Sequence, residues 1–403
     1  MSYYLKYIKY KTMYLNLKGG MKRKKSDEAN DANDADKKTK YSDNENERSL
    51  VDKTRQIPEN FPKQRTEVPH FYKIGSEKVQ RNIPIGCEKW ETVCFGYNPT
   101  NYTAEIVLKH DINTPETWSE GRGWADPKAI DTPQNGKNIN LYNIFGPSGM
   151  SYSERLENGV LKGATVRDEI NITQALITRG ATKEQLIQIA SENQFKHRFS
   201  HTGPLLFDVN EYPKNPIGRT GLIGRGSLGN WGPNHAADPV VARIHNGKLQ
   251  FILVRRADNS QWALPGGMVE AGQTISGTRK REFAEEAMNI EGITGNDRHN
   301  RLIEIEKQLT NIFDPTRNLN VVIYEGVVDD PRNTDQSWME TVAMLTFINN
   351  PDYPEDANLN LEAGDDANKV RWVNYNPNGN LFASHKLFID LAVDYLQTKG
   401  YLQ

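Results

Sequence analysis

Three glutamates, Glu282, Glu285 and Glu286, have the residue type and the spacing to bind a metal ion together. Positions i, i+3 and i+4 share one face of a helix, so their carboxylates would lie side by side and repel one another. A divalent cation such as Mg²⁺ would relieve that repulsion, because it prefers carboxylate oxygens together with water and phosphate oxygens. The alternative is a solvated helix face, on which the preceding Arg279 and Arg281 pair with these glutamates.

A glycine-rich turn before this helix favours the metal site. Pro265, Gly266 and Gly267 end a predicted strand, and residues 274–288 are expected to form the helix that carries the glutamates. Because glycine has no Cβ, the carbonyl oxygen of Gly266 or Gly267 can approach a cation that the helix holds. The turn and the helix together therefore predict a divalent-cation site.

The segment resembles the Nudix box, which has a Gly, a Glu six positions later, and then Arg-Glu-apolar-x-Glu-Glu-x-Gly-apolar. The matching residues are Gly267, Arg281, Glu282, Phe283, Glu285 and Glu286. Gln273 stands where the family pattern has Glu, and Met288 stands where it has Gly. Further strings resemble the branch of Nudix hydrolases formed by the eukaryotic mitochondrial ADP-ribose pyrophosphatases and, in degenerate form, the ADP-ribose-binding carboxy-terminal domain of the ADP-ribose-gated cation channel. These strings are 218–222, 224–226, 231–239, 329–335, 338–341, 361–367 and 383–385.

This resemblance implies Mg²⁺-dependent hydrolysis of ADP-ribose to AMP and ribose 5-phosphate, with Mn²⁺ as an alternative ion. The three glutamates would hold the metal, the carbonyl of Gly266 or Gly267 would be a further ligand, and Arg281 would orient the glutamates. Metal binding would neutralise the pyrophosphate oxygens and lower the pKa of the attacking water. Gln273 offers no charge to Arg281, so we expect an activity that is weakened but present.

Candidate substrate contacts follow from the same resemblance. Asp330 and Arg332 come after a predicted strand, where a guanidinium suits phosphate and a carboxylate suits ribose hydroxyls. The alternative for this pair is a turn with a surface ion pair. Asn234 and His385 are further candidates, and Phe382 could stack on a base or a ribose. For His385 and Phe382 the alternatives are a helix cap and packing in the core.

No residue stands out as the general base that would activate water. Glu340 and Asp335 are candidates by their position, and we keep Glu340 among the candidate catalytic residues. A metal-bound hydroxide needs little help from a base, so the absence of a clear candidate does not argue against hydrolysis.

Two other functions stay open. The first is a non-catalytic ADP-ribose sensor, but Glu282 and Phe283, the pair that the channel domain has lost, are both present in this sequence. The second is a Nudix hydrolase of another nucleotide, such as an RNA cap or a damaged nucleoside triphosphate. The support for this second alternative is the basic cluster at 22–25.

Composition restricts the class of protein. The 403 residues carry 50 Lys and Arg against 52 Asp and Glu, which argues against binding nucleic acid or a membrane by net charge. No stretch reaches the roughly 18 apolar residues that span a bilayer. Cys87 and Cys94 are too few and too close for a disulfide framework and lack a common zinc spacing, so we expect a reducing compartment. The expected protein is a cytoplasmic monomer. Residues 22–25 leave the nucleus as an alternative, and the amino-terminal sequence does not support a mitochondrial location.

The hydrophobic fraction of 36%, with a mean hydropathy of −0.72, is low, and the polar residues are concentrated near the amino terminus. Residues 1–65 are expected to form a Lys/Tyr-rich segment, with an amphipathic helix at 2–18, and a disordered charged tail. Residues 66–230 would form a lid-like domain with an insertion at about 128–202, and residues 231–403 the Nudix domain. The expected fold is α/β, a mixed sheet in a Nudix α/β/α sandwich beside a smaller, mixed or β-rich amino-terminal domain.

Hydrophobic patterns predict the individual elements. Strands are expected at 93–95, 106–108, 249–254, 321–328, 342–347 and 370–373. A capping-box pattern that begins at Thr182 predicts a helix, and an apolar stripe predicts a last helix from Ser384.

Overall fold

The computed structural model describes residues 71–74, 77–112, 124–134, 136–146, 155–269, 274–294, 298–364 and 367–402. All of them belong to one unit of the chain, Glu45–Gln403. The predicted helix at 2–18, the predicted charged tail and Gln273 lie outside the described residues. No helix among the described residues is both long enough and apolar enough to cross a membrane.

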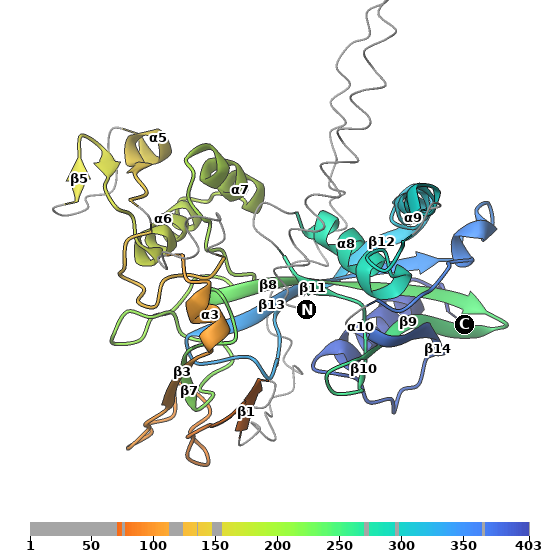
Figure 1. The fold of residues 1–403 in the computed structure, drawn as a ribbon, viewed down its shortest axis with the longest axis horizontal. Coiled ribbons are helices and arrows are strands. Elements are labelled where there is room, and N and C mark those ends of the chain that lie inside the picture. The colour runs from red at the N-terminus through yellow and green to blue at the C-terminus, as the bar shows by residue number, and fades with distance from the viewer. Residues whose placement is uncertain are drawn as a thin grey trace, which may run out of the picture. The chain divides into compact units, whose positions relative to one another are not determined.

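A seven-stranded mixed sheet forms the centre of this unit (Figure 1). Its strands are β8 (Gly232–His245), β9 (Lys248–Arg256), β10 (Trp262–Ala263), β11 (Gly267–Met268), β12 (Leu319–Val327), β13 (Ser337–Ile348) and β14 (Ala367–Asn374). The main path runs β10, β9, β8, β13, β12, while β11 pairs with β8 and β14 with β9. β8 and β13 are parallel, and the other pairs are antiparallel. The four strands predicted from 249 onward are thereby confirmed.

Helices pack on both faces of the sheet. α10 (His385–Thr398) buries Phe388 in a core that includes Val240 of β8. On the opposite face, α8 (Ile275–Met288) and α9 (Arg298–Ile312) bury Phe283 and Ile305 in a core that includes Val241. Neighbouring residues of a strand point to opposite faces, which is why Val240 and Val241 contribute to different cores. The predicted α/β fold, with a mixed sheet between helices, is confirmed.

Capping threonines explain where two helices begin. The Thr274 hydroxyl accepts a hydrogen bond from the Gly277 amide at 3.0 Å and starts α8. The capping box predicted at Thr182 is present at the start of α7 (Lys183–Glu192). The last helix begins after Ser384, as predicted.

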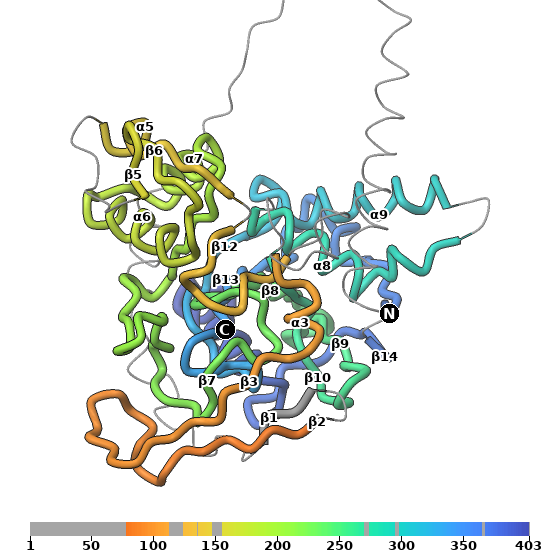
Figure 2. The backbone as a smooth tube through the Cα atoms, turned by 60° about the vertical axis from the view of Figure 1, so that its left-hand side comes forward, coloured from red at the N-terminus to blue at the C-terminus, as the bar shows by residue number. Residues whose placement is uncertain are grey.

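The region before β8 combines short strands with helices (Figure 2). Its elements are β1 (Phe71–Ile74), β2 (Glu77–Gln80), β3 (Thr100–Thr103), α3 (Glu105–Lys109), β4 (Ile139–Asn140), α5 (Leu141–Phe145), β5 (Leu156–Glu157), β6 (Val160–Leu161), α6 (Val166–Thr178), α7 and β7 (Leu222–Gly226). A short helix, η1 (Pro354–Ala357), completes the carboxy-terminal region. α5, α6 and α7 lie together, with a core of their own that contains Ile139, Leu161 and Ile172.

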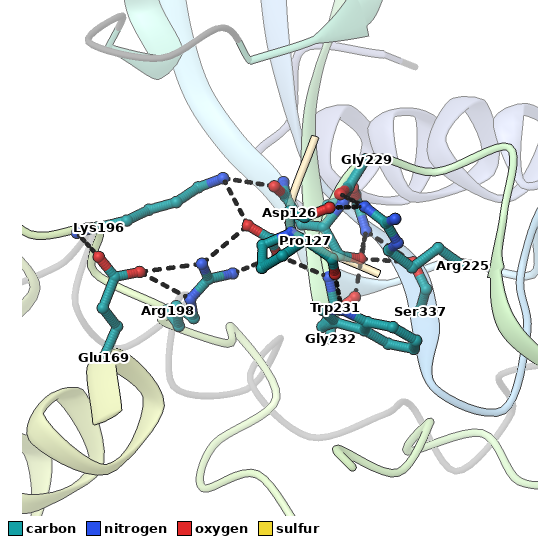
Figure 3. Close-up of polar contacts among 12 residues, drawn as sticks. Asp126, Pro127, Glu169, Lys196, Arg198, Arg225, Gly229, Trp231, Gly232 and Ser337 are labelled. Carbon is teal, nitrogen blue, oxygen red and sulfur yellow. Dashed lines mark hydrogen bonds and ion pairs between the residues drawn. The ribbon is translucent and has the colours of Figure 1, made fainter. Parts of the chain in front are cut away.

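A buried charge network joins this region to the start of β8 (Figure 3). The Arg198 guanidinium donates to both oxygens of Asp126, at 2.6 and 2.8 Å, and to Glu169 at 2.9 and 3.1 Å. Asp126 also accepts the Trp231 amide at 2.9 Å. Burial alone would raise the pKa of Asp126, but Arg198 and Lys196 outweigh it and lower that pKa to about 2. Asp126 therefore stays charged and ties the helical region to the sheet.

Three expectations for residues 87–108 are wrong. Residues 106–108 belong to helix α3, because Val107 is buried with Ala104 while Ile106 faces solvent. Residues 93–95 form no strand, and the apolar side chains of Val93 and Phe95 are exposed. Cys87 and Cys94 form a disulfide, and their Cα atoms lie 5.6 Å apart, a separation typical of this bond. This bond removes the basis for expecting a reducing compartment.

Candidate active site

The glycine turn and helix α8 are packed against each other at the three box glutamates. Glu282 is 3% exposed, and Glu285 and Glu286 are partly buried. A Cβ on Gly267 would lie 2.4 Å from Oε2 of Glu282, so the backbone of the turn touches that carboxylate directly. Any larger residue would collide with it, and this explains the glycine.

Arg281 joins two of the glutamates to the turn. Its guanidinium lies 2.6 Å from Oε1 of Glu282 and 2.9 Å from Oε2 of Glu285. It also donates to the Met268 carbonyl at 2.9 Å. Arg281 is 5% exposed, so these are buried contacts and not pairs on a solvated face. Such contacts suit the orienting role that was predicted for this residue.

The alternative of a solvated helix face fails for Arg279. Its guanidinium lies 4.4 Å from the centre of the Phe313 ring and donates to Asn320 at 3.3 Å. Burial lowers the pKa of Arg279 to about 10. The Arg279 side chain therefore packs against Phe313 and β12, away from solvent.

Glu286 and Asp238 lie on either side of Gly266. The Gly266 amide donates to Oε2 of Glu286 at 3.1 Å. A Cβ on Gly266 would lie 2.2 Å from Oδ1 of Asp238. The turn therefore brings the end of α8 close to a carboxylate of β8 that sequence reasoning did not select. Asp238 lies inside the string 231–239, and its place in that string was the sequence signal that could have identified it.

His385 and Asp238 form a buried pair beside the turn. Nδ1 of His385 accepts the Leu264 amide at 2.8 Å, so the proton of the neutral ring sits on Nε2, 3.9 Å from Oδ1 of Asp238. The other oxygen of Asp238 accepts the Thr341 hydroxyl at 2.6 Å. Burial raises the pKa of Asp238 to about 6 and lowers that of His385 to about 4. The predicted His385 is thus directed at this site.

Asp330 and Arg332 lie close enough to this pair to act on it electrostatically. Their charges shift the pKa values of both Asp238 and His385. Arg332 donates to both Asp330 oxygens at 2.8 Å, so the ion pair considered as the alternative does form. The Arg332 side chain is 42% exposed and Asp330 is buried, which leaves the guanidinium accessible to a ligand.

The remaining predicted residues differ in their accessibility. Phe382 is partly buried, with the Arg256 guanidinium 4.3 Å from its ring centre. Asn234 is fully buried, and its amide bonds within the protein, to Ser337 at 3.1 Å among others. Glu340 and Asp335 are buried as well and accept hydrogen bonds from neighbouring segments. The contacts described for Asn234, Glu340 and Asp335 are with other parts of the protein. Their predicted roles in substrate binding and catalysis stay predictions.

The donors gathered around the turn suit a hard cation. They are three carboxylates and the carbonyl oxygens of a glycine turn, which is the chemistry that Mg²⁺ prefers. Arg281 and the Gly266 amide hold the carboxylates around the turn.

Known proteins with similar sequences match most of the chain. The NUDIX domain family matches residues 235–388, and the NUDT9-like N-terminal domain family matches residues 170–232, which includes part of the stretch expected to be an insertion. The chain is 49% identical over 320 residues to the putative nudix hydrolase 6 of Caenorhabditis elegans, covering 79% of this chain and 92% of that protein. It is 45% identical over 337 residues to the mitochondrial ADP-ribose pyrophosphatase of Rattus norvegicus, covering 79% of this chain and 75% of that protein.

Two further matches cover less of the chain. A transient receptor potential cation channel subfamily M member-like 2 of Nematostella vectensis is 46% identical over 184 residues, which are 43% of this chain and 11% of that protein. The solved NUDIX domain of Shewanella oneidensis NrtR, complexed with ADP ribose, is 16% identical, with a TM-score of 0.28. The match covers 40% of this chain and 87% of that protein. At this TM-score the structural likeness carries no functional information.

Proposed function

This chain belongs to the Nudix hydrolase family, and from that premise we propose that it hydrolyses the pyrophosphate bond of ADP-ribose to give AMP and ribose 5-phosphate. The observation that carries the proposal is the set of three box glutamates on α8, Glu282, Glu285 and Glu286, of which Glu282 and Glu286 contact the Gly266–Gly267 turn. The similarity to a mitochondrial ADP-ribose pyrophosphatase over 79% of the chain supports the choice of substrate.

The residues of the turn and of α8 have separate tasks in this proposal. Glu282, Glu285 and Glu286 would hold Mg²⁺, or Mn²⁺ in its place, with the carbonyl of Gly266 or Gly267. With the ion bound, the charge of the pyrophosphate is shielded and a water molecule becomes more acidic. Arg281 fixes the directions of two carboxylates, so less reorganisation is needed when the substrate arrives.

The substrate would be positioned by groups on the other side of the turn. The exposed Arg332 guanidinium suits a phosphate oxygen, and its partner Asp330 suits a ribose hydroxyl. The Nε2 proton of His385 can be donated to a phosphate or ribose oxygen, because Leu264 already occupies the other ring nitrogen. Phe382 would stack on a ring of the substrate.

The direct test is incubation of the purified chain with ADP-ribose and Mg²⁺, followed by chromatographic separation of the products. We expect AMP and ribose 5-phosphate in equal amounts, and a loss of about 10²-fold or more in Glu286→Gln, because a ligand of the catalytic ion is removed. Glu304→Gln on the exposed face of α9 is the matched control and should keep the parent rate. Failure to release AMP would refute the proposal.

The same incubation distinguishes the other two functions. Tight binding of ADP-ribose without AMP would indicate a sensor, which the similarity to a channel-like protein makes the second candidate. Against it, Glu282 and Phe283 are both present, and Glu282 is packed in the site. Turnover of capped RNA without turnover of ADP-ribose would indicate a different nucleotide substrate. Monomeric state and cytoplasmic location stay predictions.

A further inference from the structure

Two histidines and a glutamate outside the Nudix box lie close together beside strands β8 and β13. They are His201 in the segment after α7, His235 on β8 and Glu340 on β13, where Glu340 and His235 are partners in the parallel ladder. One potential ligand atom from each lies within 4.8 Å of the other two. His201 is 5% exposed and Glu340 is fully buried, while His235 is partly buried. The two histidines take no part in the hydrolysis proposed above, and Glu340 enters it only as a candidate general base.

The protonation of His235 leaves one ring nitrogen free to bind a metal. Its Nε2 lies 2.9 Å from the carbonyl oxygen of Phe199, and since a carbonyl can only accept, Nε2 carries the proton. Nδ1 therefore has a lone pair, and it is buried without a hydrogen-bond partner among the described residues. Burial lowers the pKa of His235 well below its usual value and keeps the ring neutral. Neutral imidazole is the form that binds metals.

His201 is oriented by a second carboxylate. Its Nδ1 is in close contact with Glu325, which also accepts from Lys183 at 2.8 Å. Burial would raise the pKa of Glu325, but its contacts with His201 and Lys183 lower that pKa well below its usual value. The carboxylate therefore holds the His201 proton on Nδ1 and leaves Nε2 as the nitrogen with a lone pair. A carboxylate behind a histidine is the common support of a metal-binding imidazole.

Glu340 supplies the negative charge. Its Oε1 accepts from the Ser200 hydroxyl at 2.7 Å and from the Trp338 indole at 2.9 Å. Its Oε2 accepts the His201 amide at 2.6 Å, which leaves a lone pair on that oxygen. These hydrogen-bond donors among the described residues are neutral, and a buried carboxylate without a cation is costly.

We propose that Nε2 of His201, Nδ1 of His235 and Oε2 of Glu340 bind one transition-metal ion of the zinc class. Two imidazoles and a carboxylate are a donor set that this class of ion prefers over Mg²⁺. The candidate ligand atoms lie within 4.8 Å of one another. Ligands on a tetrahedral ion with bonds of about 2.1 Å lie about 3.4 Å apart, so binding requires the side chains to close by up to about 1.4 Å.

Such an ion would fasten the segment after α7 to the sheet. His201 lies three residues after Arg198, which Figure 3 shows bound to Asp126 and Glu169. The carbonyl of His235 accepts the Val269 amide at 2.8 Å, so the site also adjoins the strand that carries the glycine turn. The ion would therefore stabilise the fold next to the Nudix box, and the thermal unfolding temperature should rise when it binds.

The test uses the full chain, stripped of metal and kept in excess Mg²⁺ so that the box glutamates are supplied with a hard cation. Co²⁺ is then titrated as a probe, because its visible absorption reports four-coordinate binding with nitrogen ligands. We expect one equivalent of absorbing Co²⁺ that Zn²⁺ displaces. Glu325→Gln should weaken binding by about 10–100-fold, and His235→Ala should abolish the absorption. His245→Ala, at the exposed end of the same strand, is the matched control.

Two results would overturn the proposal. One is an absorption that survives in His235→Ala or disappears in Glu285→Gln, which would place the ion at the box. The other is X-ray absorption of the Zn²⁺-loaded parent chain that contains no imidazole in the first coordination shell. This second measurement needs no variant, so it decides the question even if His235→Ala does not fold.

Discussion

Gly267→Ala should slow catalysis while the chain stays folded. The added Cβ would lie 2.4 to 2.5 Å from all three carboxyl atoms of Glu282, whereas ordinary contacts begin at 3.4 Å. The carboxylate must therefore retreat by about 1 Å, and a shift of this size in a catalytic group costs about 10²-fold in rate. Crowding of this kind costs about 1–3 kcal/mol of the free energy of unfolding, and the displaced atoms belong to the end of a flexible side chain. Steady-state assays with ADP-ribose should show the loss in kcat.

Gly277→Ala is the matched control for this substitution. It adds the same methyl group to α8, where the Cβ would lie 3.2 Å from the Thr274 hydroxyl. Alanine is the better helix former by about 1 kcal/mol, so this variant should be as stable as the parent and fully active. If Gly267→Ala turned over ADP-ribose at the parent rate while remaining folded, Glu282 would not be held by the turn for catalysis, and the metal-site geometry proposed for it would be wrong.

Three other predictions test the box, the buried network and the acid beside the turn. Gln273→Glu should raise kcat about tenfold by restoring a charged partner for the box arginine, and an unchanged rate would show that this position does not limit turnover. Asp126→Asn should lower the free energy of unfolding in urea by about 3 kcal/mol, because Arg198 loses one of its two buried carboxylate partners and keeps only Glu169; a loss below about 1 kcal/mol would contradict this. Burial raises the pKa of Asp238 from 3.8 to about 6, so its contribution to stability is full below about pH 4 and is lost as pH rises through 6. Between about pH 4 and pH 7 the free energy of unfolding of the parent should therefore fall by about 3 kcal/mol relative to that of Asp238→Asn. If urea unfolding gave the same pH dependence for both proteins, the assignment would be refuted.

The box was predictable because its parts are consecutive in the chain. A turn of two glycines and glutamates at helical spacing are both local patterns, and the structure places Gly267 against Glu282. Asp238 was not predictable in the same way. Its position next to Gly266 depends on the pairing of β11 with β8, and no local pattern reports that pairing.

Apolar patterns failed where tertiary contacts decided the outcome. A β-branched run at 106–108 predicts a strand, but the chain buries Val107 by forming a short helix. The group of His201, His235 and Glu340 also escaped prediction. Each is an isolated residue in the sequence, and the parallel pairing of β8 with β13 brings the last two together. Long-range strand pairing thus hid the site residues, whereas tertiary burial decided the structure of residues 106–108.

The loop that carries the predicted substrate contacts is built from distant parts of the chain. The buried Arg81 guanidinium donates to the carbonyls of Pro331 and Asn333, at 2.8 and 2.9 Å, and to Thr220 at 3.0 Å. The Asp335 amide donates to the Leu222 carbonyl at 2.8 Å. Because these bonds cross the proposed boundary near residue 230, the two regions are not separable modules. A fragment beginning at residue 231 would lose Arg81 and Leu222, which hold the loop at 329–335 in place. The two regions should therefore be expressed and engineered together, as one unit.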